Sequence, residues 1–169
     1  MRTDEQIAAH AAALHRQAIV IDGHSDILMS VADGKVRLGA VTPIPAPDLW
    51  EPPLGFVVED MGSPGSIDAH SAFFGPAGHY SIPQFLAGGV TAQACAIFLE
   101  DHQLERALQR GLEMAWWLHK EAEENEAFEL ITTVADIHRL KRAGKVGGIL
   151  TFEGFDPLGF DLRFLDIFY

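Results

Sequence analysis

Residues 18–26 read AIVIDGHSD, and this stretch indicates the architecture of the chain. Residues 18–21 form a short, continuous apolar run, which is typical of a strand buried on both faces of a parallel sheet. The run stops at Asp22, and the polar segment that follows carries His24 and Asp26. We therefore predict a buried parallel strand, followed at its carboxyl end by side chains of the types that bind metal ions.

Strands and helices are predicted to alternate along the rest of the chain. Helices are predicted over residues 3–17, 103–127, 133–143 and 161–169, and strands over residues 90–99, 128–131 and 146–152. The two clearest capping signals are Thr3 followed by Gln6, and Thr133 followed by Asp136, with Gly144 ending the second helix. This alternation predicts an α/β fold with a parallel sheet.

The predicted helix over residues 103–127 carries two side-chain patterns. Its predicted apolar face consists of Leu104, Leu108, Leu112, Ala115 and Leu118. Several glutamates, Glu121 among them, crowd its carboxyl end without any interleaved histidine. We predict that these glutamates form a solvated acidic face rather than a metal site.

Residues 29–78 show little regular pattern. Asp33 and Gly34, between Val31 and Val36, predict a hairpin turn, because such turns need residues that tolerate positive φ. Six of the nine prolines fall between residues 43 and 64. We predict one domain over residues 1–169 with a loop or hairpin insertion over 29–78, which is either a functional cover or a solvated insertion without a role.

Composition limits the classes of protein to consider. The 169 residues are 48% hydrophobic and 21% charged, which is typical of a globular domain, and the net charge of −12 argues against a nucleic-acid partner. The single cysteine excludes an internal disulfide and a thiolate zinc site, so we expect a cytoplasmic location. No apolar run is long enough to predict a membrane segment. A closed (β/α)8 barrel needs about 250 residues, more than this chain has.

Two of the predicted strands end in possible metal ligands. His24 and Asp26 lie two residues apart after the first strand, so their side chains point the same way along extended backbone. Glu153 follows the strand over residues 146–152, and a carboxylate there can bridge two metals. The alternatives are a hydrogen-bonded turn for His24 and Asp26, and a capping or solvated role for Glu153.

Three blocks of sequence resemble the renal (membrane) dipeptidase family of zinc peptidases. Residues 21–26 are similar to that family's Asp-Gly-His-Asn-Asp segment. Residues 81–93, SIPQFLAGGVTAQ, resemble its next block, and residues 144–154 with 162–169 resemble a third block built around Glu-Gly. The order and spacing of the blocks match along nearly the whole chain.

The resemblance implies a (β/α)8 barrel with a two-zinc centre that hydrolyses dipeptides by attack of a metal-activated water on the peptide carbonyl. About three of the eight βα units would lie in this chain. By position, His24 and Asp26 would bind one zinc and Glu153 would bridge both. Asp22, next to these ligands, would either support the site or have a role in an N-terminal turn. The resemblance places the other zinc ligands, the proton-handling aspartate and the arginine for the substrate carboxylate beyond Tyr169. No catalytic residue is therefore expected within the chain, and the second zinc site would be incomplete.

Two positions depart from the family pattern: Ser25 stands where asparagine is usual, and Phe155 stands where a second glycine is common. The first functional hypothesis is the N-terminal part of a zinc dipeptidase, inactive by itself. The alternative is a non-catalytic remnant or self-associating α/β domain, a homo-oligomer that keeps half a metal site. Apolar sheet edges and helix faces left open by an incomplete barrel would favour such association.

Overall fold

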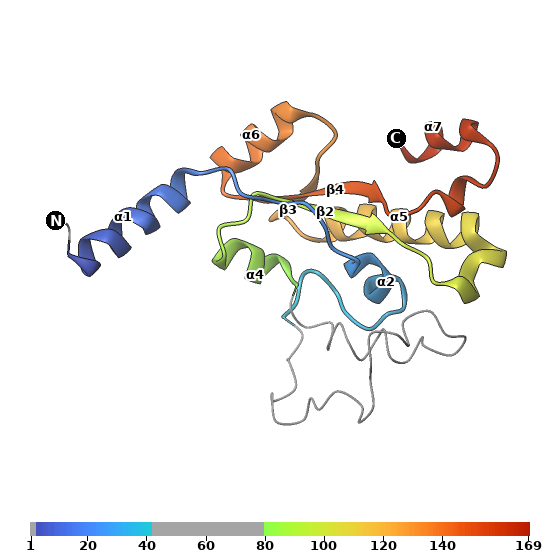
Figure 1. The fold of residues 1–169 in the computed structure, drawn as a ribbon, viewed down its shortest axis with the longest axis horizontal. Coiled ribbons are helices and arrows are strands. Elements are labelled where there is room, and N and C mark those ends of the chain that lie inside the picture. The colour runs from blue at the N-terminus through green and yellow to red at the C-terminus, as the bar shows by residue number, and fades with distance from the viewer. Residues whose placement is uncertain (1–2, 42–79) are drawn as a thin grey trace, which may run out of the picture.

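The computed structural model describes residues 3–41 and 80–169. Most of the predicted insertion over residues 29–78, with its prolines, lies outside these ranges. In the described part, helices surround a central sheet, and α1 projects away from the body (Figure 1).

The sheet has four parallel strands in the order β1-β2-β4-β3. The strands are β1 (Ile21–Asp22), β2 (Ala92–Ile97), β3 (Phe128–Leu130) and β4 (Val146–Phe152). β2 and β4 pair over six residues and form the centre of the sheet, while β3 pairs only with the first half of β4. The prediction of an α/β fold with a parallel sheet is confirmed.

The first strand differs from its prediction over residues 18–21. β1 covers only Ile21–Asp22, and Ile21 is half-exposed rather than buried. The reason is the position of β1 at one edge of the described sheet, where β2 is its only partner. The backbone of Val20 still joins this edge, because its carbonyl accepts hydrogen bonds from Thr91 and Ala92.

The helices form two groups around the sheet. The α-helices are α1 (Asp4–Gln17), α2 (Ile27–Ala32), α4 (Ile82–Ala87), α5 (Ala107–Glu124), α6 (Val134–Ala143) and α7 (Leu165–Phe168), and the 3-10 helices are η4 (Asp101–Arg106), η5 (Asp156–Leu158) and η6 (Leu162–Phe164). The main core packs α2, α4 and α5 against Cys95 and Ile97 of β2. A smaller core packs α6 against Ala92 of the same strand.

The predicted capping signals are confirmed. The Thr3 and Gln6 side chains exchange hydrogen bonds with each other's backbone at the start of α1, and Thr133 and Asp136 do the same at the start of α6. Gly144 ends α6 with φ of +68°, a left-handed conformation that favours glycine. These ends were predictable because each capping interaction spans only three residues.

The predicted hairpin at Asp33-Gly34 is wrong. The residues before it form α2, and Asp33 caps the carboxyl end of that helix. Ile27, Leu28 and Val31 are all buried, and their spacing of three and four residues matches one face of a helix. Gly34 does adopt a positive φ, but it follows a helix rather than joining two strands.

The long helix buries a face that matches the predicted one only in part, with Leu118 buried as predicted. η4 precedes α5, and α5 buries Gly111, Met114 and Leu118, while Leu104 and Leu112 are exposed. Gly111 lies against Pro157, where an added Cβ would come within 2.7 Å of the proline ring. The close approach of η5 therefore helps to select the buried face.

Glu121 is fully buried, so the predicted solvated acidic face is wrong at this position. Arg37 donates from Nε to Glu121 Oε1 (2.5 Å) and from Nη2 to Glu124 Oε2 (2.5 Å), and its guanidinium lies 5.0 Å from the Trp117 ring centroid. Asn125 donates to the other Glu121 oxygen (2.9 Å). A buried carboxylate needs such partners, and Arg37 lies 84 residues away in the sequence.

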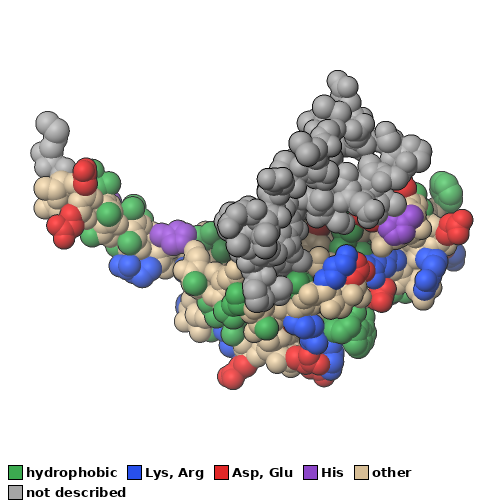
Figure 2. Space-filling model, turned by 90° about the horizontal axis from the view of Figure 1, so that it is seen from below, with side chains coloured by type: hydrophobic (Ala, Val, Ile, Leu, Met, Phe, Trp, Pro, Cys, Tyr) green, Lys and Arg blue, Asp and Glu red, His purple; other side chains and the backbone are tan. Residues whose placement is uncertain are grey.

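Charges of both signs are interspersed over the body, as Figure 2 shows for one face. The projecting α1 has no buried residue and is tied to the body by a 2.7 Å hydrogen bond between His15 Nε2 and the Gly88 carbonyl. No helix in the described ranges has the length and apolar character needed to cross a bilayer.

Candidate metal centre

β2 holds the two segments that carry the predicted ligands. The Ala96 N–H donates to the Ser25 carbonyl (2.8 Å), in the segment that follows β1. The Glu153 N–H, just after β4, donates to the Ile97 carbonyl (3.0 Å). Consecutive residues at the end of β2 therefore fix both segments at the carboxyl edge of the sheet, where parallel α/β folds place their sites.

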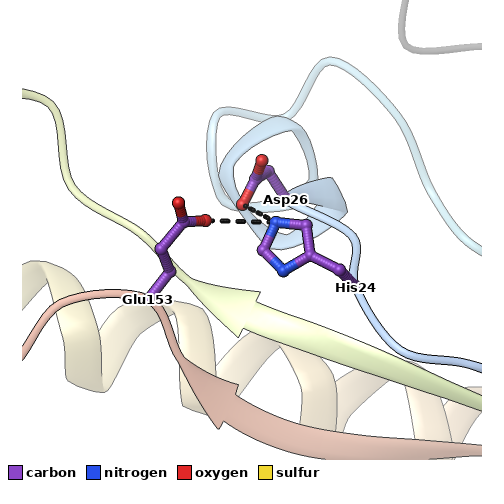
Figure 3. A group of neighbouring side chains, drawn as sticks. All are labelled: His24, Asp26 and Glu153. Carbon is purple, nitrogen blue, oxygen red and sulfur yellow. Dashed lines mark ion pairs between the residues drawn. The ribbon is translucent and has the colours of Figure 1, made fainter.

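The three predicted ligands converge at this edge. His24 Nε2 lies 3.1 Å from Glu153 Oε2 and 3.4 Å from Asp26 Oδ1, as Figure 3 shows. One ligand atom from each residue lies within 4.8 Å of the other two. Within residues 3–41 and 80–169, these three side chains form the one group of histidine, cysteine, aspartate or glutamate residues that lie close enough together to hold a metal ion.

The start of α2 explains why Asp26 faces the cluster. Asp26 occupies the N-cap position, but its carboxylate makes no capping hydrogen bond. Instead, the Ser25 hydroxyl accepts the Ile27 N–H (3.2 Å). Ser25 entered the sequence predictions only as a departure from the family pattern. The signal that could have revealed this contact is a serine two residues before a helical N–H, since serine hydroxyls accept such bonds in local turns.

Asp22 contacts the backbone of the ligand segment. Its Oδ1 accepts a hydrogen bond from the His24 N–H (3.2 Å) and so fixes the turn between β1 and the histidine. This bond acts on the main chain of His24 rather than on the imidazole ring.

The cluster fits a divalent cation. Ligand atoms about 2.0–2.1 Å from a tetrahedral zinc lie about 3.3 Å from one another, close to the two distances from His24 Nε2. Asp26 Oδ1 is buried and has no hydrogen bond from the part of the chain that the structure describes. The His24 and Glu153 side chains are 54% and 50% exposed, so the site is open to solvent. Two carboxylates beside one imidazole therefore form an open, electronegative site of the chemistry that zinc prefers.

Cys95 does not belong to this site. It lies in β2 and is buried, and burial together with the nearby Asp22 charge raises the pKa of its thiol to about 12. Because the thiolate is the form that binds metals and attacks substrates, this cysteine is an inert core residue at neutral pH. The expected donor set of histidine and carboxylates is therefore the one the structure assembles.

The fold and the cluster together define a parallel α/β protein with a candidate metal centre at the carboxyl edge of its sheet. The profile of the membrane dipeptidase family, peptidase family M19, matches residues 8–169, and the chain belongs to this family. The predicted family is confirmed.

The fold is similar to that of a solved M19 protein. That crystal structure is described as dipeptidase AC, a metallopeptidase of family M19; it is 22% identical to this chain and superposes with a TM-score of 0.59. The match covers 89% of this chain and 39% of that one, so these 169 residues correspond to part of a barrel-like dipeptidase fold. No curated protein sequence matches the chain.

Proposed function

We propose that this chain supplies the first half of the metal centre of a zinc-dependent dipeptidase. Membership of the M19 family supports peptide hydrolysis as the reaction class. The observation that carries the proposal is the convergence of His24, Asp26 and Glu153 within 4.8 Å at the carboxyl edge of the sheet.

Each residue has a distinct role in this proposal. The neutral imidazole of His24 offers Nε2, and Asp26 offers Oδ1, to the first zinc. Glu153 would help to hold both the first ion and a second one, while Asp22 holds the His24 backbone. When bound, zinc polarises a carbonyl oxygen and lowers the pKa of a coordinated water.

We assign dipeptides as the substrates and negligible hydrolysis to these 169 residues alone. Three ligands form one cluster, and the described ranges contain no second cluster that could complete a two-metal centre. A proton-handling group beside the peptide bond is also needed for this reaction. Measurable dipeptide hydrolysis by the purified chain would overturn this assignment.

Zinc titration of the purified chain by isothermal calorimetry tests the proposal. We expect one zinc per chain, with affinity at least 100-fold weaker in His24→Ala, because removing one of three ligands leaves an incomplete site. His102→Ala is a matched control, since His102 is 50% exposed and lies 3.4 Å from the Glu100 carboxylate, but lies outside the cluster. Absence of zinc binding, or equal affinity in the wild type and His24→Ala, would refute the proposal.

A further inference from the structure

We infer that Ser25 is a positioning residue that keeps the Asp26 carboxylate available for metal. Its hydroxyl accepts the Ile27 N–H at the start of α2, so this bond spans Asp26 and fixes the turn that carries the Asp26 side chain. The inference rests on the proposed metal role of Asp26.

An aspartate at an N-cap position ordinarily turns its carboxylate back onto the first N–H groups of its own helix. Asp26 departs from this behaviour: it is the N-cap of α2, yet no capping bond forms, and its Oδ1 lies 3.4 Å from His24 Nε2. Three other helices, α1, α4 and α6, show the ordinary arrangement. Thr3, Ser81 and Thr133 each accept a backbone N–H of their own helix.

Ser25 is held firmly in place for this role. The residue is 3% exposed, so its hydroxyl is shielded from competition by water. Its carbonyl accepts the Ala96 N–H, which anchors its backbone to β2. The Ile27 N–H that it accepts belongs to a buried residue and would lose its partner if the hydroxyl were removed.

Removing the hydroxyl therefore changes what Asp26 does. In Ser25→Ala, the Ile27 N–H loses its acceptor, and the turn between His24 and α2 that carries Asp26 loses the bond that fixes it. The Asp26 carboxylate then samples more orientations, and metal binding must restrict them. We expect zinc affinity to fall about tenfold, the lower end of the effect of losing a group that orients a metal ligand.

The test compares three variants of the chain by zinc calorimetry and thermal unfolding. Ser25→Ala removes the hydroxyl, and Ser25→Asn restores an acceptor for the Ile27 N–H through its side-chain carbonyl. Ser81→Ala is the matched control, because Ser81 is equally buried and its hydroxyl accepts the Gln84 N–H at the start of α4, away from the cluster. We expect weaker zinc binding in Ser25→Ala, recovery in Ser25→Asn, and lower thermal stability with wild-type zinc affinity in Ser81→Ala.

The outcomes separate this inference from the proposed function. If the wild type binds no zinc, the metal role fails and the inference fails with it. If the wild type and Ser25→Ala bind zinc within twofold of each other, the metal role stands and the positioning role is wrong. An equal loss of zinc affinity in Ser25→Ala and Ser81→Ala would also overturn the positioning role, because the loss would then follow from general destabilisation of the fold.

Discussion

Two groups of carboxylates differ in whether the chain itself supplies a cation to balance their negative charge. Glu121 is fully buried on α5, and Arg37 and Asn125 satisfy both of its oxygens. Glu153 is half-exposed at the carboxyl edge of the sheet, where Glu153 Oε2 and Asp26 Oδ1 both lie near His24 Nε2. The first group contains its own cation, whereas the second gathers two carboxylates around one imidazole.

This difference separates an acidic group that is satisfied within the fold from one that is open to solvent. A buried carboxylate without a partner costs several kcal/mol, so a protein that buries one supplies the cation from its own chain. The ligand cluster instead stays open to solvent and leaves Asp26 Oδ1 without a hydrogen bond from the described residues. Such a cluster is suited to bind a cation from solution.

The largest expected effect is on the buried group. Arg37→Met leaves the Glu121 carboxylate buried without its cation and removes the contact with Trp117, so we expect the free energy of unfolding to fall by about 3 kcal/mol. Urea unfolding measures this loss. Arg163→Met is the control, because Arg163 pairs with Asp161 on the exposed surface, and the change in its free energy of unfolding should be much smaller.

The double variant Arg37→Met, Glu121→Met sharpens this result. Replacing both partners by apolar side chains removes the unpaired charge, so most of the lost stability should return. A loss below about 0.5 kcal/mol in Arg37→Met alone would show that Arg37 does not hold the Glu121 charge.

The next effect concerns the open cluster. Zinc in 100-fold excess over its dissociation constant should stabilise the folded chain by about 2.7 kcal/mol, because it binds the folded state and links the segments after β1 and β4. Thermal unfolding should show a rise of about 5–10 °C in the wild type.

Two variants test where this stabilisation arises. The zinc-dependent rise in melting temperature should vanish in His24→Ala and persist in Arg37→Met, since the two clusters share no residue. Equal increments in the wild type and His24→Ala would mean that zinc acts elsewhere on the chain.

Local patterns predicted much of this architecture. The capping pairs at Thr3 and Thr133, the strand over residues 146–152 and the end of α6 at Gly144 each depend on residues close in sequence. The convergence of His24 and Asp26 with Glu153 was also predictable, because strand ends in a parallel sheet meet at one edge.

The errors arose where a distant partner decides the outcome. Glu121 looks solvated in sequence because Arg37, which neutralises it, lies 84 residues away. Asp33 and Gly34 resemble a hairpin turn in the sequence. In the fold, Arg110 of α5 binds both Asp33 and the Met29 carbonyl, and these contacts hold the end of α2. Sequence patterns report local preference, whereas these features depend on tertiary contacts.

Asp136 offers the smallest and most specific test, because it is a partly exposed carboxylate with its own partners. Hydrogen bonding from the Thr133 hydroxyl, followed by that from Arg139, lowers the pKa of Asp136 from 3.8 to about 2. A carboxyl group with a lower pKa in the folded state stabilises the fold above its unfolded pKa, and this contribution is lost as the pH falls from about 4 to 2. Asp136→Asn should therefore lower the melting temperature slightly at pH 7, and the difference from the wild type should shrink as the pH falls from 4 and disappear only below the folded-state pKa of about 2. A difference that stays constant over this range would show that the carboxylate charge does not contribute, so that the α6 cap depends on side-chain shape alone.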